Sequence, residues 1–194
     1  MSDQTSRDQI NIVAISCSPF GGGKTRTAIE AVLSGAAAAG ARTTLIELGE
    51  DPGSPPDYEA AVEAIRAADG IAFGSPMYRA TYTQQFKALT EAIPRTPDDA
   101  PLAGRAVTTV ATAGSDHHML GMSGMRDILV DFFAAHLVSP GLFVSPAGFD
   151  GRRCRRRCRS APRPSASDSW SSRRRSVRRA ASHGPPRTLS AGGG

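Results

Sequence analysis

Residues 10–27 of the chain read Ile-Asn-Ile-Val-Ala-Ile-Ser-Cys-Ser-Pro-Phe-Gly-Gly-Gly-Lys-Thr-Arg-Thr. The first seven of these residues are rich in β-branched side chains, which predicts a buried strand over residues 10–16. A loop rich in Pro and Gly follows, and residues 24–39 then contain helix formers that end at Gly40, a typical C-terminal cap. A strand, a glycine-rich loop and a helix in this order are typical of an α/β domain with a parallel sheet.

The same alternation continues as far as residue 150. Further strands are predicted over residues 43–48, 70–74, 106–112 and 141–145, and further helices over residues 58–68, 82–93 and 119–137. The last of these helices is predicted to bury one apolar face, made of Met122, Met125, Ile128, Leu129, Phe132 and Phe133. The predicted fold is a doubly wound, five-stranded parallel sheet. Such a sheet needs a fifth helix after its last strand, and we expect that helix to be missing.

Charge divides the chain into two parts. The whole chain has a formal net charge of +5, yet residues 1–150 carry 10 Lys and Arg against 17 Asp and Glu. Residues 151–194 carry 13 Arg against one acidic residue, Asp168, and few large apolar side chains. Such a segment buries too little surface to offset the entropy of ordering it, so we predict a disordered Arg/Ser/Pro/Gly-rich tail. Two hypotheses account for the tail: a shifted reading frame in a GC-rich gene, or a basic arm that binds nucleic acid.

Composition excludes several classes of protein. No apolar run reaches the roughly 20 residues that span a bilayer, so we expect no membrane-spanning segment. The polar N-terminus lacks the features of a secretory signal, and we therefore expect a cytoplasmic location. The three cysteines have no His nearby at zinc-site spacing, so we expect no metal site.

The first loop, residues 16–27, is predicted to bind a phosphate. Ligands of a doubly wound sheet bind where its strands end, and this loop brings hydroxyls, glycines and two cations, Lys24 and Arg26, to the start of a helix. One alternative is a nucleoside triphosphatase, but its motif would need a Gly where Ser18 stands. Another alternative is that the glycines only form a turn.

The second loop, residues 74–82, combines the aromatic ring of Tyr78 with the stiff turn of Pro76. A flat heterocycle needs an apolar wall of this kind and main-chain groups at its edge. The alternative is a loop that only packs its two tyrosines.

The third loop, residues 112–118, contains Ser115, Asp116 and His118. These three residues suggest a hydrolase triad, but the loop lacks the Gly-x-Ser-x-Gly turn that exposes a hydrolase nucleophile. Hydrolysis is therefore disfavoured.

Together the three loops resemble those of the NADPH-dependent FMN reductase family of flavodoxin-like proteins, over roughly residues 10–143. The matching motifs are Ser18-Pro19 with Thr25-Arg26-Thr27, then Gly74-Ser75-Pro76-Met77-Tyr78 with Phe86-Lys87, then Ala111-Thr112-Ala113-Gly114-Ser115 with His118-Met119-Leu120. The resemblance implies a flavodoxin-like sheet in strand order 2-1-3-4-5. It also implies an NAD(P)H-dependent FMN reductase, which transfers hydride from NADPH or NADH to FMN.

The resemblance further implies which residues hold the cofactor. The FMN phosphate would be held by Ser18, Thr25, Arg26 and Thr27. The ribityl chain and the isoalloxazine would be lined by Pro76, Met77, Tyr78 and Arg79, and the pyrimidine edge by Thr112, Ala113, Gly114 and Ser115. No catalytic residue is assigned. His118 is a candidate contact of the ring or the substrate, and a solvent-facing histidine is the alternative.

Family members of this kind form homodimers or homotetramers, and some supply reduced flavin to a partner monooxygenase, so the same is expected here. The chain departs from the family pattern in its longer first loop and in Ala113, which replaces a usual Gly. The alternative function is a flavodoxin-like scaffold whose basic C-terminal arm binds nucleic acid.

Overall fold

The structure is a computed structural model that describes residues 9–49, 55–151 and 153–155 of the 194-residue chain. Its helices are α1 (Lys24–Ala38), α2 (Tyr58–Ala67), α3 (Gln84–Ala92) and α4 (Met122–Asp127), with short helical turns η1 (Asp116–Gly121), η2 (Ile128–Phe132) and η3 (Pro146–Gly148). Its strands are β1 (Asn11–Ser16), β2 (Arg42–Glu47), β3 (Gly70–Met77), β4 (Ala106–Ala113), β5 (His136–Leu137), β6 (Leu142–Val144), β7 (Phe149–Asp150) and β8 (Arg153–Cys154).

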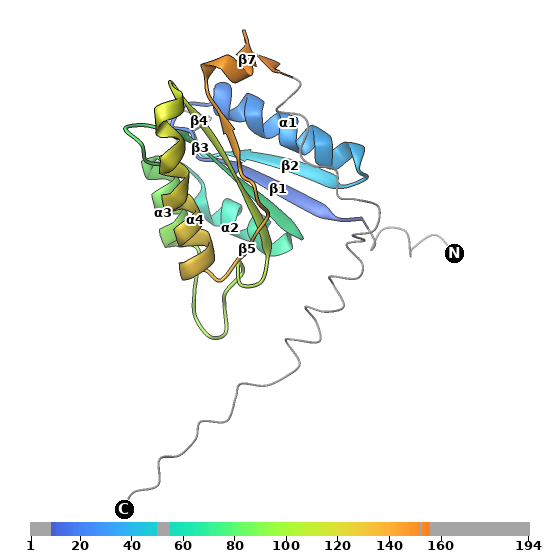
Figure 1. Cartoon of the computed structure of the whole chain (residues 1–194). Coiled ribbons are helices and arrows are strands. Elements are labelled where there is room, and N and C mark those ends of the chain that lie inside the picture. Colours follow the sequence, from blue (N-terminus) through green and yellow to red (C-terminus); the bar gives the residue numbers. More distant parts are fainter. Residues whose placement is uncertain (1–8, 50–54, 152, 156–194) are drawn as a thin grey trace, which may run out of the picture. The chain divides into compact units, whose positions relative to one another are not determined.

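The main sheet is parallel and has the order β2-β1-β3-β4-β5, which confirms the predicted flavodoxin-like order 2-1-3-4-5. Helix α1 lies on one face of the sheet, and α3 and α4 lie side by side on the other (Figure 1). The alternating side chains of the strands therefore feed two separate cores.

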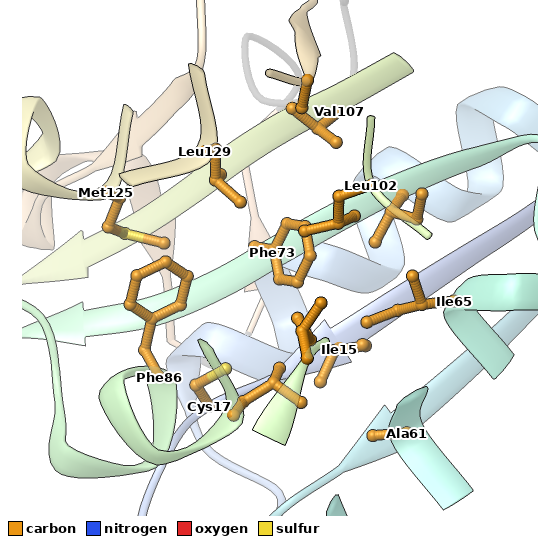
Figure 2. Packing of buried hydrophobic residues seen from close by; sticks show 14 of the residues in the cluster. Ile15, Cys17, Ala61, Ile65, Phe73, Phe86, Leu102, Val107, Met125 and Leu129 are labelled. Carbon is orange, nitrogen blue, oxygen red and sulfur yellow. The ribbon is translucent and has the colours of Figure 1, made fainter. Parts of the chain in front are cut away.

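The core on the α2, α3 and α4 side holds the largest side chains. Phe73 of β3 meets Phe86 of α3 edge-to-face, with ring centroids 6.0 Å apart, and Ile65 of α2 and Leu129 of η2 surround them (Figure 2). The core under α1 is built of smaller residues, including Ala14, Ala28, Ile29, Ala72 and Val110. Small residues let α1 lie close to the strands. The N-terminus of α1 lies at the edge where β1 ends, because a short loop joins Ser16 to Lys24.

The predicted fifth strand differs from the observed one. The prediction was a single strand over residues 141–145, whereas two pieces, β5 and β6, pair in parallel with β4. Pro140 lies between the two pieces, and because proline has no N–H it cannot continue the ladder. Gly141 lies close against β4, since a Cβ there would be 2.3 Å from Thr109 Oγ1.

The predicted helix over residues 119–137 is also corrected. The segment is helical only from η1 through η2, and it ends in a π-helical turn in which the Phe133 N–H donates to the Ile128 carbonyl. The wider turn moves Phe132 off the predicted buried face, so that it is 56% exposed, whereas Phe133 lies in the core as predicted. Residues 136 and 137 leave the helix and form β5.

The described structure includes short strands on both sides of residue 150, where the domain boundary was predicted. Strands β7 and β8 form an antiparallel hairpin around Gly151, which has a φ of 57°. Phe149 of β7 and Cys154 of β8 are both buried in the α1-side core. Among the described residues after β6, no further α-helix forms. The predicted disorder and frame shift otherwise concern residue 152 and residues 156–194, which lie outside the described residues.

Across the described ranges, no helix combines the length and the hydropathy needed to cross a membrane. In the same part of the chain, no three His, Cys, Asp or Glu residues are grouped so that they could hold a metal ion.

Candidate functional site

Three loops meet at the carboxyl edge of the sheet. Ser16, at the end of β1, pairs with Glu47 of β2 on one side and with Gly74 of β3 on the other. Strands β3 and β4 run three residues farther, so Met77 lies opposite Ala113. The predicted strand over residues 70–74 was too short, because the β4 partner provides ladder hydrogen bonds as far as Met77. The register therefore places all three predicted loops on one edge.

Thr83, the N-cap of α3 directly after the second loop, links the first loop to the second by hydrogen bonds. The Thr83 hydroxyl donates to the Cys17 carbonyl at 2.6 Å, and the Thr83 N–H donates to Ser75 Oγ at 3.1 Å. The Cys17 thiol is fully buried in the larger core, and this burial raises its pKa far above the ordinary range. The thiol therefore stays protonated and packs as a small apolar group.

The N-terminus of α1 is the main group of hydrogen-bond donors at this edge. Helix α1 begins at Lys24, its N-cap Gly23 makes no side-chain cap hydrogen bond, and its first turn has no acidic residue. Gly22 has a φ of 68°, a conformation that favours glycine and turns the loop into the helix. The first N–H groups of a helix have no partner within the helix and bear partial positive charge, so this end of α1 suits an anion.

The hydroxyl groups predicted to hold a phosphate lie near this helix end but point elsewhere. Ser18 Oγ donates to the Phe20 carbonyl at 2.8 Å, and Thr27 Oγ1 donates to the Gly23 carbonyl at 3.5 Å. Thr25 is only 3% exposed, and its hydroxyl makes a 2.7 Å hydrogen bond with the Thr112 hydroxyl of β4. Thr25 and Thr112 thus tie α1 to the sheet.

Arg26 lies between two carboxylates. Its Nε donates to Glu30 at 2.8 Å and its Nη1 donates to Glu47 at 2.5 Å. These two ion pairs raise the pKa of Arg26. The second oxygen of Glu47 accepts the Gly22 N–H at 3.3 Å, and the Glu47 side chain is only 4% exposed.

Sequence reasoning missed Glu47. The available signal was an acidic residue near the end of a predicted edge strand beside the first loop. Parallel strands end at the same edge, so a carboxylate on β2 reaches the loop that follows β1.

The second loop contains a strained turn. The Tyr78 and Thr81 backbones exchange hydrogen bonds of 2.9 Å and 3.1 Å, while Arg79 and Ala80 have φ values of 51° and 63°. Two consecutive positive φ values are those of a type I′ turn, in which Asn-Gly is the usual pair. The turn presents the Tyr78 ring to solvent.

The residues of the second loop that were predicted to line the cofactor fall into two pairs, one buried and one exposed. Pro76 and Met77 are buried residues of β3, and Met77 is only 2% exposed within the larger core. Tyr78 and Arg79 are exposed at the edge. Pro76 and Met77 are therefore part of the buried sheet, whereas Tyr78 and Arg79 are accessible at its edge.

The turn η1, which continues from the third loop, packs against the second loop. Gly121 lies against the turn, since a Cβ there would be 2.5 Å from the Ala80 carbonyl oxygen. Ala113 and Ser115 are half-buried, Gly114 is exposed, and Ser115 Oγ lies 3.0 Å from His118 Nδ1. Next to them, Met119 and Leu120 expose apolar side chains.

The edge thus combines an uncapped helix N-terminus with an apolar rim. Its exposed large apolar residues are Phe20 on the first loop, Tyr78 on the second loop, and Met119 and Leu120 on η1, which follows the third loop. A ligand with an anionic group at one end and a flat, weakly polar ring at the other is complementary to such an edge.

Comparison with known proteins gives one family. The model of the family described as NADPH-dependent FMN reductase matches residues 10–150. The chain is 38% identical over 94 residues to the NADH-dependent FMN reductase SfnF of Pseudomonas putida, and the alignment covers 48% of each protein. It is 31% identical over 100 residues to an FMN reductase (NADPH) of Pseudomonas aeruginosa, with 52% of each covered. The chain spans about half the length of these curated relatives.

Solved structures agree on the fold. An apo NADH:FMN oxidoreductase, EmoB, superposes with a TM-score of 0.61 at 27% identity, covering 73% of this chain and 78% of that one. A WrbA-like flavodoxin from Agrobacterium tumefaciens superposes with a TM-score of 0.59 at 22% identity, covering 74% and 88%. The second likeness concerns the fold alone.

Proposed function

The chain belongs to the NADPH-dependent FMN reductase family, and on that premise we propose that it transfers hydride from NADPH or NADH to FMN. The observation that carries this proposal is the uncapped N-terminus of α1, which lies at the same edge as an apolar rim. When bound, the flavin supplies the redox chemistry by accepting the hydride, which leaves NAD(P)⁺ and reduced FMN. The residues of the chain therefore need only bind and orient the two cofactors.

The FMN phosphate would bind at the N-terminus of α1. The main-chain N–H groups of the first helical turn and the Arg26 guanidinium are its donors, with the Ser18 and Thr27 hydroxyls beside them. Thr25 would act indirectly, because its hydroxyl already binds Thr112 and fixes where the helix begins.

The isoalloxazine would lie between the second and third loops. Tyr78 and Arg79 would cover one part of it, while Pro76 and Met77 support the turn from within β3. Residues 113–115 would meet the pyrimidine edge with main-chain groups, and Thr112 would hold that loop on β4. His118 would orient the substrate through the ring nitrogen that does not face Ser115.

An anaerobic assay of nicotinamide oxidation tests the proposed function. The purified chain is mixed with FMN and either NADH or NADPH, because the relatives are named for one nicotinamide or the other. The expected result is parallel loss of nicotinamide and flavin absorbance, which the same mixture without protein does not show. Absence of catalysed oxidation with both nicotinamides would overturn the proposal.

We further propose a homodimer or homotetramer, a partner monooxygenase that takes the reduced flavin, and a cytoplasmic location, where NAD(P)H is available. The exposed apolar residues around the site support an interface there. Size-exclusion chromatography with light scattering tests the oligomer. The alternative, a basic arm that binds nucleic acid, has no support from the comparisons or from the described residues.

A further inference from the structure

Glu47 occupies hydrogen-bond donors that a phosphate would use. Its carboxylate accepts the Gly22 N–H at 3.3 Å and Arg26 Nη1 at 2.5 Å, both at the N-terminal end of α1. We propose that Glu47 is an internal anion that competes with the FMN phosphate for these donors, so that FMN binds weakly enough to exchange. This inference rests on the proposed function.

The charges near the helix end support competition. Arg26 is paired with both Glu30 and Glu47, and the Lys24 ammonium lies 5.4 Å from the centroid of the Phe149 ring. The two cations, Arg26 and Lys24, balance the two carboxylates, Glu30 and Glu47, so the four charges sum to zero. A phosphate therefore gains little from Arg26 unless one of the carboxylates leaves it. A buried carboxylate also repels the phosphate more strongly than an exposed one, because less water screens it.

The backbone around Glu47 keeps its carboxylate in place. The Leu48 N–H donates to the Ser16 carbonyl at 3.0 Å, and the Gly21 N–H donates to the Gly49 carbonyl at 2.8 Å. Gly49 itself lies flush against the first loop, since a Cβ there would be 2.2 Å from the Ser18 carbonyl oxygen. Glu47 is therefore held at the phosphate end of the site, and the phosphate must compete with it.

Glu30 provides a matched control. It pairs with the same Arg26 at a similar distance, but its side chain is 51% exposed, against 4% for Glu47. Solvent screens an exposed charge of this kind, so its effect on a bound phosphate is small. A specific role for Glu47 therefore predicts different results for Glu47→Gln and Glu30→Gln.

The test compares FMN with riboflavin, which lacks the phosphate. Dissociation constants for both flavins are measured by fluorescence quenching in the wild-type chain, in Glu47→Gln and in Glu30→Gln. Glu47→Gln keeps the shape of the side chain and is expected to tighten FMN binding about tenfold, the effect of removing one nearby charge. Riboflavin binding is expected to stay unchanged in every variant, and FMN binding nearly unchanged in Glu30→Gln.

Unchanged or weaker FMN binding in a folded Glu47→Gln would overturn the inference, as would an equal gain for riboflavin. In the Arg26→Gln background the gain from Glu47→Gln is expected to be smaller, because Arg26 is one of the two donors for which Glu47 competes. If Glu47→Gln does not fold by circular dichroism, Glu47→Asp is used. It retracts the carboxylate by one methylene and is expected to give a smaller gain in the same direction. Failure of the proposed function is distinct, since the wild-type chain would then bind neither flavin.

Discussion

At the amino edge of the sheet Arg66 forms a two-pronged ion pair with Asp99 and also pairs with Glu63. At the carboxyl edge Arg26 likewise pairs with two carboxylates, those of Glu30 and Glu47. Arg105 adds to the amino edge by donating to the carbonyl oxygens of Ala68 and Arg66. These hydrogen bonds and ion pairs connect the C-terminal end of α2 to the segments that precede β3 and β4. The carboxyl edge instead has an uncapped helix, a strained turn and exposed apolar rings. Paired charges alone therefore do not distinguish the two edges, whereas the uncapped N-terminus of α1 belongs to the carboxyl edge.

The largest effect is expected from Gly49→Ala at the carboxyl edge. Its Cβ would lie 2.2 Å from the Ser18 carbonyl oxygen, so the first loop must move. We expect a loss of about 1–3 kcal/mol in unfolding free energy from this overpacking. FMN affinity is expected to fall about tenfold, with a smaller fall for riboflavin. Denaturant unfolding and flavin fluorescence measure both quantities.

The control for this substitution is Gly35→Ala, on the exposed side of α1, where an added Cβ meets nothing within 4 Å. It is expected to stabilise the helix by about 0.5–1 kcal/mol and to leave flavin binding unchanged. If the two alanine variants behave alike, the first loop is not braced by the end of β2.

A smaller effect is expected from Gly121→Ala, which forces the third loop away from the second. The new Cβ would lie 2.5 Å from the Ala80 carbonyl oxygen. Because this contact supports the ring end of the site, FMN and riboflavin are expected to lose affinity equally, by about fivefold. A loss confined to FMN would mean that the second and third loops do not hold the ring.

Ala80→Gly removes part of the strain in the turn. Ala80 has a φ of 63°, which glycine adopts without steric cost, so we expect a gain of about 0.5–1 kcal/mol in unfolding free energy. The matched variant is Ala60→Gly in the first turn of α2, where the same change is expected to destabilise. A loss of stability in both variants would contradict the left-handed conformation at position 80.

The smallest effect is expected at the amino edge. Hydrogen bonds from Arg66 hold the pKa of Asp99 below its ordinary value, so the ion pair stabilises the fold at neutral pH and is lost as the pH falls through the lowered pKa. Asp99→Asn is expected to lower the melting temperature slightly at neutral pH, and the difference should vanish in strong acid. Flavin affinity is expected to stay unchanged, and a change in it would erase the distinction between the two edges.

Periodicity and loop composition were sufficient to predict the alternation of strands and helices and the meeting of three loops at one edge, whereas the order of the strands was implied by the family resemblance. The meeting of the loops follows from local pattern and from the rule that parallel strands end together. The π-helical turn that exposes Phe132 was not predictable, because an amphipathic pattern does not reveal a single wide turn. The Arg79-Ala80 turn was not predictable either, because neither of its two positive-φ residues is a glycine that would signal it.

Long-range pairs account for the remaining differences at the site. Thr25 was predicted to hold the phosphate, and its bond to Thr112 joins residues 87 positions apart. Glu47 reaches Arg26 across 21 positions and from another strand. Sequence patterns identified the loops, and packing determined which of their side chains are buried and which are accessible.

Titration of the ¹⁵N-labelled chain with FMN, followed by amide chemical shifts, tests the central claim that the carboxyl edge is the flavin site. We expect the largest shifts for Gly22 and the first turn of α1, for the turn at Tyr78–Thr81 and for Gly114–His118. The amides of Arg66, Asp99 and Arg105 should not move. Saturable shifts centred on the amino edge, or none at saturating FMN, would contradict it.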